Sequence, residues 1–93
     1  MDNYQSQLIW RGQSIGLFDN PTPDMWYLEG YWLSNQTEAA TTFETLAKRL
    51  NSQEVYRDWD NGIEIIIQED AGEQTRAVVF GLSSESLLFV RRI

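Results

Sequence analysis

Apolar and polar positions alternate in short runs over the first third of the chain. Residues 8–10 and 15–18 are apolar and flank Arg11-Gly12-Gln13, which predicts a hairpin. Residues 19–24 contain both prolines of the chain, and because proline lacks an amide donor we expect a loop there. Large side chains alternate over residues 25–33, which predicts a third strand that buries Trp26, Leu28 and Trp32 on one face.

The spacing of the apolar residues changes after residue 35 and predicts a helix. Asn35 and Glu38 have the spacing of a capping box, in which side chains satisfy the first free amides of a helix. From there to about residue 51 the apolar positions follow the helical period. We expect this face to pack on a sheet through Phe43, Leu46 and Leu50.

The second half of the chain returns to strand patterns. Residues 55–59 and 63–69 flank Asp60-Asn61-Gly62, and Asn-Gly favours a two-residue hairpin turn because both residues tolerate a positive φ. Residues 76–82 and 87–92 follow, with polar turns before each. The predicted order is β-β-β-α-β-β-β-β, an α+β fold in which one amphipathic helix packs on one face of an antiparallel β-sheet. Residues 1–93 are expected to form a single domain.

The composition removes most kinds of catalytic and metal chemistry. The chain has no His and no Cys, so it lacks an imidazole base, a thiol nucleophile and the usual ligands of zinc. No glycine-rich phosphate loop is present. The densest carboxylate cluster, Asp58, Asp60 and Glu64, is interpreted as a solvated turn. We therefore expect a protein that is not an enzyme and that binds neither a cofactor nor a metal.

The charge of the chain narrows the choice of partner. Fourteen acidic residues against seven basic ones give a formal net charge of -7, which repels phosphate backbones and anionic lipid headgroups. Neither nucleic acid nor a membrane is therefore an expected partner. The longest apolar run, residues 77–82, is far too short to span a bilayer, and the first residues do not resemble a secretory signal. A cytoplasmic location is expected.

The second face of the third predicted strand is the candidate site. Tyr27, Glu29 and Tyr31 share the parity opposite to the buried tryptophans, and Asp19 and Asp24 lie in the adjacent loop. Tyrosine is favoured at binding surfaces because it buries a large area at low entropic cost. These five residues predict a docking face for a protein partner that carries basic groups. The alternative for the two tyrosines is cross-strand packing with the first hairpin.

Three functions remain open at this stage. The first is a small acidic non-catalytic protein-interaction domain, such as an inhibitor, an immunity-like protein or an accessory protein. The second is a small-ligand-binding domain whose aromatic residues line a concavity between helix and sheet. The third is a homo-oligomeric structural subunit that pairs through open sheet edges. A monomer or a weak homo-oligomer is expected.

Overall fold

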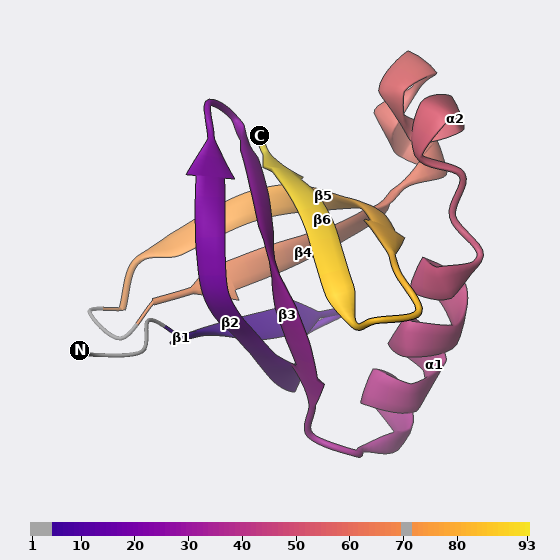
Figure 1. The fold of residues 1–93 in the computed structure, drawn as a ribbon. Coiled ribbons are helices and arrows are strands. Elements are labelled where there is room, and N and C mark those ends of the chain that lie inside the picture. Colours follow the sequence, from indigo (N-terminus) through magenta and orange to yellow (C-terminus); the bar gives the residue numbers. More distant parts are fainter. Residues whose placement is uncertain (1–4, 70–71) are drawn as a thin grey trace.

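Six antiparallel strands form a closed barrel in the computed structural model, which describes residues 5–69 and 72–93 (Figure 1). The strands are β1 (Gln5–Trp10), β2 (Gln13–Asp24), β3 (Tyr27–Ser34), β4 (Ile63–Gln68), β5 (Gln74–Leu82) and β6 (Leu87–Arg92). Between β3 and β4 the chain forms the helices α1 (Glu38–Lys48) and α2 (Ser52–Arg57) and a 3-10 turn over Trp59–Asn61.

The barrel consists of two three-strand meanders that meet along two seams. The strand order is β1-β2-β3-β6-β5-β4, and β1 also pairs with β4, with Leu8 opposite Ile67. The other seam joins β3 to β6, with Gly30 opposite Leu88. The open sheet covered by a helix, predicted from the sequence, is therefore wrong, although the pairing is antiparallel throughout. The error arises because the β1–β4 seam joins segments far apart in the chain, and no turn signal marks such a pairing.

Helix α1 lies across one end of the barrel. Its N-cap is Thr37, whose hydroxyl accepts a hydrogen bond from the Ala40 amide at 3.2 Å. The predicted cap residue, Asn35, instead accepts from the backbone amide and the hydroxyl of Thr37. The buried face of α1 consists of Ala40, Phe43 and Ala47, whereas Leu46 is 36% exposed, so the prediction of Leu46 in the core is wrong.

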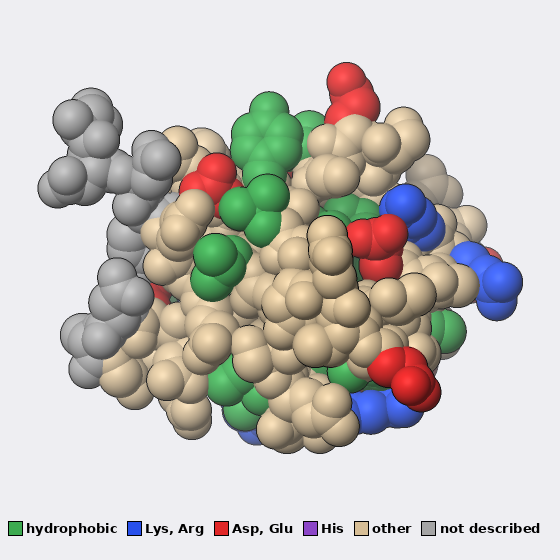
Figure 2. Space-filling model, turned by 90° about the horizontal axis from the view of Figure 1, so that it is seen from below, with side chains coloured by type: hydrophobic (Ala, Val, Ile, Leu, Met, Phe, Trp, Pro, Cys, Tyr) green, Lys and Arg blue, Asp and Glu red, His purple; other side chains and the backbone are tan. Residues whose placement is uncertain are grey.

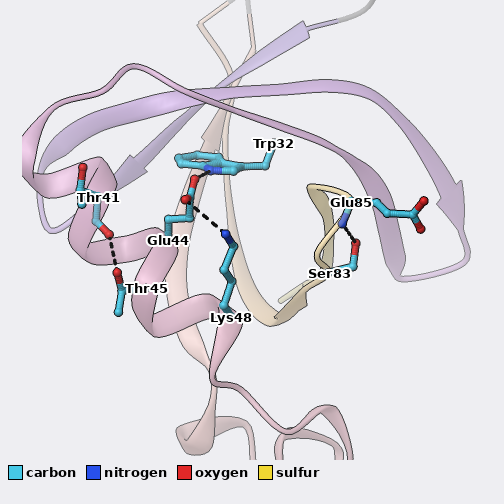
Figure 3. Close-up of polar contacts among 7 residues, drawn as sticks. All are labelled: Trp32, Thr41, Glu44, Thr45, Lys48, Ser83 and Glu85. Carbon is cyan, nitrogen blue, oxygen red and sulfur yellow. Dashed lines mark hydrogen bonds and ion pairs between the residues drawn. The ribbon is translucent and has the colours of Figure 1, made fainter.

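Two tryptophans and one phenylalanine join α1 to the barrel interior. The Phe43 ring lies 5.8 Å from Trp10 and 5.2 Å from Trp32, measured between ring centroids. Trp32 is buried, and its indole Nε1 donates to Glu44 Oε1 at 2.7 Å (Figure 3). Lys48 Nζ lies 3.5 Å from the other oxygen of Glu44. Because a buried indole N–H requires a hydrogen-bond partner, Glu44 fixes α1 against the strand that carries Trp32.

The strand and the hairpin turn predicted for residues 55–62 are wrong. Asn51 caps α2 by accepting from the Gln53 amide at 3.0 Å, and Asp58 accepts from the Asp60 amide at 3.0 Å. Such side chain–backbone bonds stabilise helical turns in competition with a strand. Gly62 has a φ of -91°, so it does not adopt the positive φ of the predicted turn.

The β2–β3 hairpin is longer than predicted. Strand β2 continues to Asp24 through an irregularity between Asp19 and Thr22, and the two prolines lie in this second half rather than in a loop. The turn therefore falls at Met25 and Trp26, which are 79% and 59% exposed. The prediction of Trp26 in the core is wrong for this reason. Leu28 and Trp32 do belong to the main hydrophobic cluster or pack against it, as does Leu50.

A Phe43→Ala variant is expected to lose about 3–5 kcal/mol of unfolding free energy, the usual cost of emptying a buried aromatic site. Phe43 is fully buried and contacts both tryptophan rings, so few side chains can relax into the space. Urea denaturation followed by tryptophan fluorescence measures the loss. A variant as stable as the wild type would show that α1 is not part of the core.

A Gly62→Ala variant is expected to lose about 1–3 kcal/mol because of overpacking. A Cβ atom at Gly62 would lie 2.5 Å from Val78 Cγ1 and 2.7 Å from the backbone oxygen of Val79. Gly81→Ala is the matched control, since a Cβ there meets nothing within 4 Å. Thermal unfolding of both variants separates them, and equal melting temperatures would contradict the close approach at Gly62.

Candidate functional site

The five residues predicted for the site lie on the outer surface of β2 and β3. In the register of these strands Asp19 is opposite Tyr31, and Asp24 is opposite Tyr27. Glu29 is opposite Thr22, between these two pairs. We refer to Asp19, Asp24, Tyr27, Glu29 and Tyr31 as the outer face. Strand alternation explains this grouping, because the opposite parity of β3 points into the barrel.

The carboxylates of the outer face are largely free of internal partners. Asp24 and Glu29 are exposed, and neither makes an ion pair or a side-chain hydrogen bond within residues 5–69 and 72–93. Asp19 accepts a hydrogen bond from Gln5 Nε2 at 3.0 Å. The salt bridges found in the described residues lie on α1, between Lys48 and Glu44, and on the β4–β5 pair. The outer face therefore keeps its negative charge uncompensated by a direct contact.

Tyr31 is the exposed aromatic residue of the outer face. It is 51% exposed, and Leu33, two residues further along the same side of β3, is 43% exposed. Figure 2 shows one face of the molecule, on which hydrophobic side chains protrude and acidic side chains are exposed. In the strand register Tyr31 lies opposite Asp19. Tyr31 thus adds apolar contact area next to free carboxylates.

Tyr27 differs from Tyr31, because it belongs to a cluster of aromatic rings outside the barrel. Its ring stacks on Phe89 with 5.5 Å between the centroids and an interplanar angle of 2°. It also meets Phe80 edge-on at 5.8 Å and Tyr56 of α2 at 5.7 Å. Tyr27 therefore supports the attachment of α2 to the barrel, and its ring partners lie on α2, β5 and β6 rather than on the first hairpin, where the sequence alternative put them.

Arg91 closes one end of this ring cluster. Its guanidinium carbon lies 4.4 Å from the centroid of the Trp59 ring and 5.4 Å from that of Tyr27, within the range of cation–π attraction. Its Nε atom is buried and has no hydrogen-bond partner among the described residues. Partial burial raises the pKa of the Tyr56 hydroxyl above its usual value, and the neighbouring Tyr27 raises it further.

Two shallow hollows flank Glu29 and were not predicted from the sequence. One has a volume of about 270 Å³ and includes Asp24, Tyr27 and Glu29 in its lining. The other, of about 310 Å³, extends from Glu29 past Phe80 to the β5–β6 turn. Phe89 lines both. These hollows depend on the β3–β6 seam, which brings Glu29 opposite Phe89, and local sequence patterns carry no signal for that contact.

The acidic side chains of the described residues do not gather into a metal-ligand group. No three or more potential ligands from His, Cys, Asp and Glu converge there. Of the acidic cluster noted in the sequence, Asp58 caps the following turn and Glu64 accepts from Arg76 Nε at 2.9 Å. Within the same residues, no helix is long and apolar enough to cross a membrane.

Comparison of the chain with protein-family models, curated proteins and solved structures finds no match. The interpretation of the site therefore rests on its geometry and its charge.

The two tyrosines of the outer face should respond differently to substitution. Tyr27→Ser is expected to lower the unfolding free energy by about 2 kcal/mol, because it removes a ring with three aromatic neighbours. Tyr31→Ser should change it by less than about 1 kcal/mol, since most surface substitutions have small effects. Chemical denaturation of the two single variants measures both values. Equal losses of unfolding free energy would show that Tyr31 is packed against other side chains rather than exposed.

Proposed function

We propose that this protein is a non-catalytic binding domain that docks on a basic protein surface through the outer face. One observation carries the proposal: Asp24 and Glu29 are exposed, make no ion pair within residues 5–69 and 72–93, and line hollows on the side of the barrel that also carries the exposed Tyr31. Charge, aromatic area and concave surface thereby occur together on one side of the barrel.

Electrostatics favours a partner that presents arginine or lysine. The formal charge of -7 raises the rate of encounter with a positive surface at low salt. After contact, Asp24 and Glu29 can accept charge-assisted hydrogen bonds without first breaking an internal ion pair. Arginine fits better than lysine, because its planar guanidinium binds carboxylates with two parallel bonds and stacks on aromatic rings.

The hollows beside Glu29 supply positions for anchoring side chains. Phe89 lines both hollows and Tyr27 lines the first, so a guanidinium bound to a carboxylate can lie against an aromatic ring. Interfaces gain most of their affinity from a few side chains that are buried in such positions. Tyr31 lies next to Glu29 on the same side of β3 and extends this contact area.

The two alternative functions weighed from the sequence lose the features on which they depended. Pairing through open sheet edges has no basis in a ring where β1 pairs with β4, because a closed barrel leaves no free edge. A ligand concavity between α1 and the sheet is filled by Phe43, Trp10 and Trp32, which are buried against each other.

Neutralising the outer face should weaken the binding of an arginine-rich peptide. A titration of the ¹⁵N-labelled protein with a synthetic Arg-Gly-Arg-Gly-Arg peptide should shift the amide signals of residues 22–31 and 87–91. The Asp24→Asn/Glu29→Gln variant should bind at least about tenfold more weakly, the loss expected for two charged hydrogen bonds. Raising the salt concentration should reduce wild-type binding, because it screens exposed charges.

The control variant Glu73→Gln/Glu85→Gln removes the same amount of charge at exposed positions outside the outer face. It should keep most of the affinity. Equal weakening of the two double variants would show that only the net charge attracts the peptide, and the proposed docking face would then be wrong.

A further inference from the structure

The interior of the barrel changes character along its axis. At the α1 end the inward side chains are apolar and buried in the main hydrophobic cluster. At the opposite end a cavity of about 210 Å³ opens to solvent. Its apolar walls include Phe18, Leu28 and Ile67, and its polar groups come from Ser6, Thr75 and Arg92. In Figure 1 this end lies where the tip of the β2–β3 hairpin and the C-terminus come together.

Ser6 at the inner part of this cavity has an unsatisfied hydroxyl. It is 1% exposed and occupies an inward position of β1, two residues before the buried Leu8. Its Oγ atom has no hydrogen-bond partner among the residues that the structure describes. A buried hydroxyl without a partner costs about 1–3 kcal/mol, and such groups are rare in folded proteins. Ser6 therefore adds to the cavity lining a hydroxyl that has no partner among the described residues.

The rim of the cavity holds a cation in a fixed position. Arg92 Nη2 donates to the backbone oxygen of Met25 at 3.0 Å, which ties the guanidinium to the β2–β3 turn. This is the single side-chain hydrogen bond of Arg92 within the described residues, so its other N–H groups remain able to donate. Thr75 adds a partly buried hydroxyl to the lining.

The backbone also contributes to the shape of the cavity. Strand β2 bends inward at its irregularity, where Asn20 has a φ of 49°, and brings Pro21 to the wall. This approach requires a glycine at position 30, because a Cβ there would lie 2.9 Å from Phe18 Cε1, Pro21 Cα and the Asp19 backbone oxygen. Gly30 therefore allows β2 and β3 to approach closely beside the cavity.

The volume limits the size of a ligand. A dry apolar cavity of about 150 Å³ accommodates a benzene molecule, so about 210 Å³ suits one ring with a small polar substituent. Larger drug-sized ligands occupy about 300 Å³ or more.

The charged groups around the cavity limit the net charge that a ligand can carry. Arg92 opposes a cation at the rim, while the net charge of -7 opposes an anion.

We propose that the open end of the barrel is a binding site for an uncharged one-ring compound, such as an aromatic amide or a small heterocycle. The ring packs between Phe18, Leu28 and Ile67. One polar group of the ligand bonds the Ser6 hydroxyl, and a carbonyl oxygen accepts from Arg92. This site opens into the barrel interior, whereas the outer face points away from it, so the two proposals are tested separately.

Benzamide is a suitable probe, because it combines one ring with a donor and an acceptor and carries no charge. In ¹⁵N-NMR titrations it should shift the amide signals around Ser6, Thr75 and Arg92, with a dissociation constant on the order of 1 mM. Benzoate and benzylamine, which differ mainly in charge, should bind at least about fivefold more weakly. Toluene tests the contribution of the apolar walls alone and should also bind more weakly than benzamide.

Two variants test the role of the polar groups. Ser6→Ala should weaken benzamide binding about fivefold to tenfold, the value of one hydrogen bond, and should raise the melting temperature because it removes an unsatisfied hydroxyl. Thr75→Val is a second variant at the lining and should also weaken binding. Ser14→Ala, at an exposed position of β2, is the matched control and should change neither quantity.

Three results would overturn the proposal. These are no signal change up to about 20 mM benzamide, changes located away from the barrel opening, or unchanged affinity in both Ser6→Ala and Thr75→Val. In each case the cavity is not a binding site for a compound of this class.

Discussion

The pairing of β1 with β4 is the constraint on which the rest of the structure depends. Only a few residue pairs form this seam, with Gln7 opposite Gln68, Leu8 opposite Ile67 and Ile9 opposite Ile66. No short turn holds these strands together, so the chain must lose considerable loop entropy before they meet. Burial of the inward side chains offsets this loss, since Leu8, Ile65 and Ile67 are almost completely removed from water. Closing the ring separates an interior from an exterior, and both candidate sites follow from that separation.

The segment between β3 and β4 packs against the barrel in two places, at one end and on the outside. Helix α1 brings Phe43 to the end of the interior, where Trp10 and Trp32 surround it. The following helix packs Val55 on the outside of β5, against Val78 and Phe80. One connection therefore stabilises two hydrophobic clusters on opposite sides of the same strands. Tyr27 takes part in the outer cluster, which explains why one tyrosine of the outer face has a structural role and the other does not.

Both proposed sites lie at polar groups that have no partner among residues 5–69 and 72–93. Asp24 and Glu29 are free at the surface, where solvation makes this inexpensive. Ser6 is free in the interior, where the same situation costs stability. Proteins commonly accept such costs at functional positions, because an unsatisfied group is ready to bind a ligand. The two sites use different chemistry, with charge on the outside of the barrel and neutral hydrogen bonding at its open end.

The sequence by itself determined the local features of this protein. Alternation assigned Leu28 and Trp32 to the interior and Glu29 and Tyr31 to the exterior, and helical spacing located α1, because both periods are properties of neighbouring residues. The net charge and the absence of His and Cys were likewise fixed before any folding. Where local signals competed, the prediction was wrong, as for the hairpin turn expected at Asn61-Gly62.

Tertiary structure alone decided the closure of the barrel and everything that depends on contacts between distant residues. The seams set which strand lies opposite Glu29, and therefore the hollows beside it. They also set the cavity at Ser6, a residue whose local pattern is that of an ordinary polar strand position. The position of Trp26 was decided in the same way, because the register of β2 with β3, rather than the prolines, determined where the turn falls. Pairing between distant segments depends on the sum of many packing contacts, and no local pattern contains that sum.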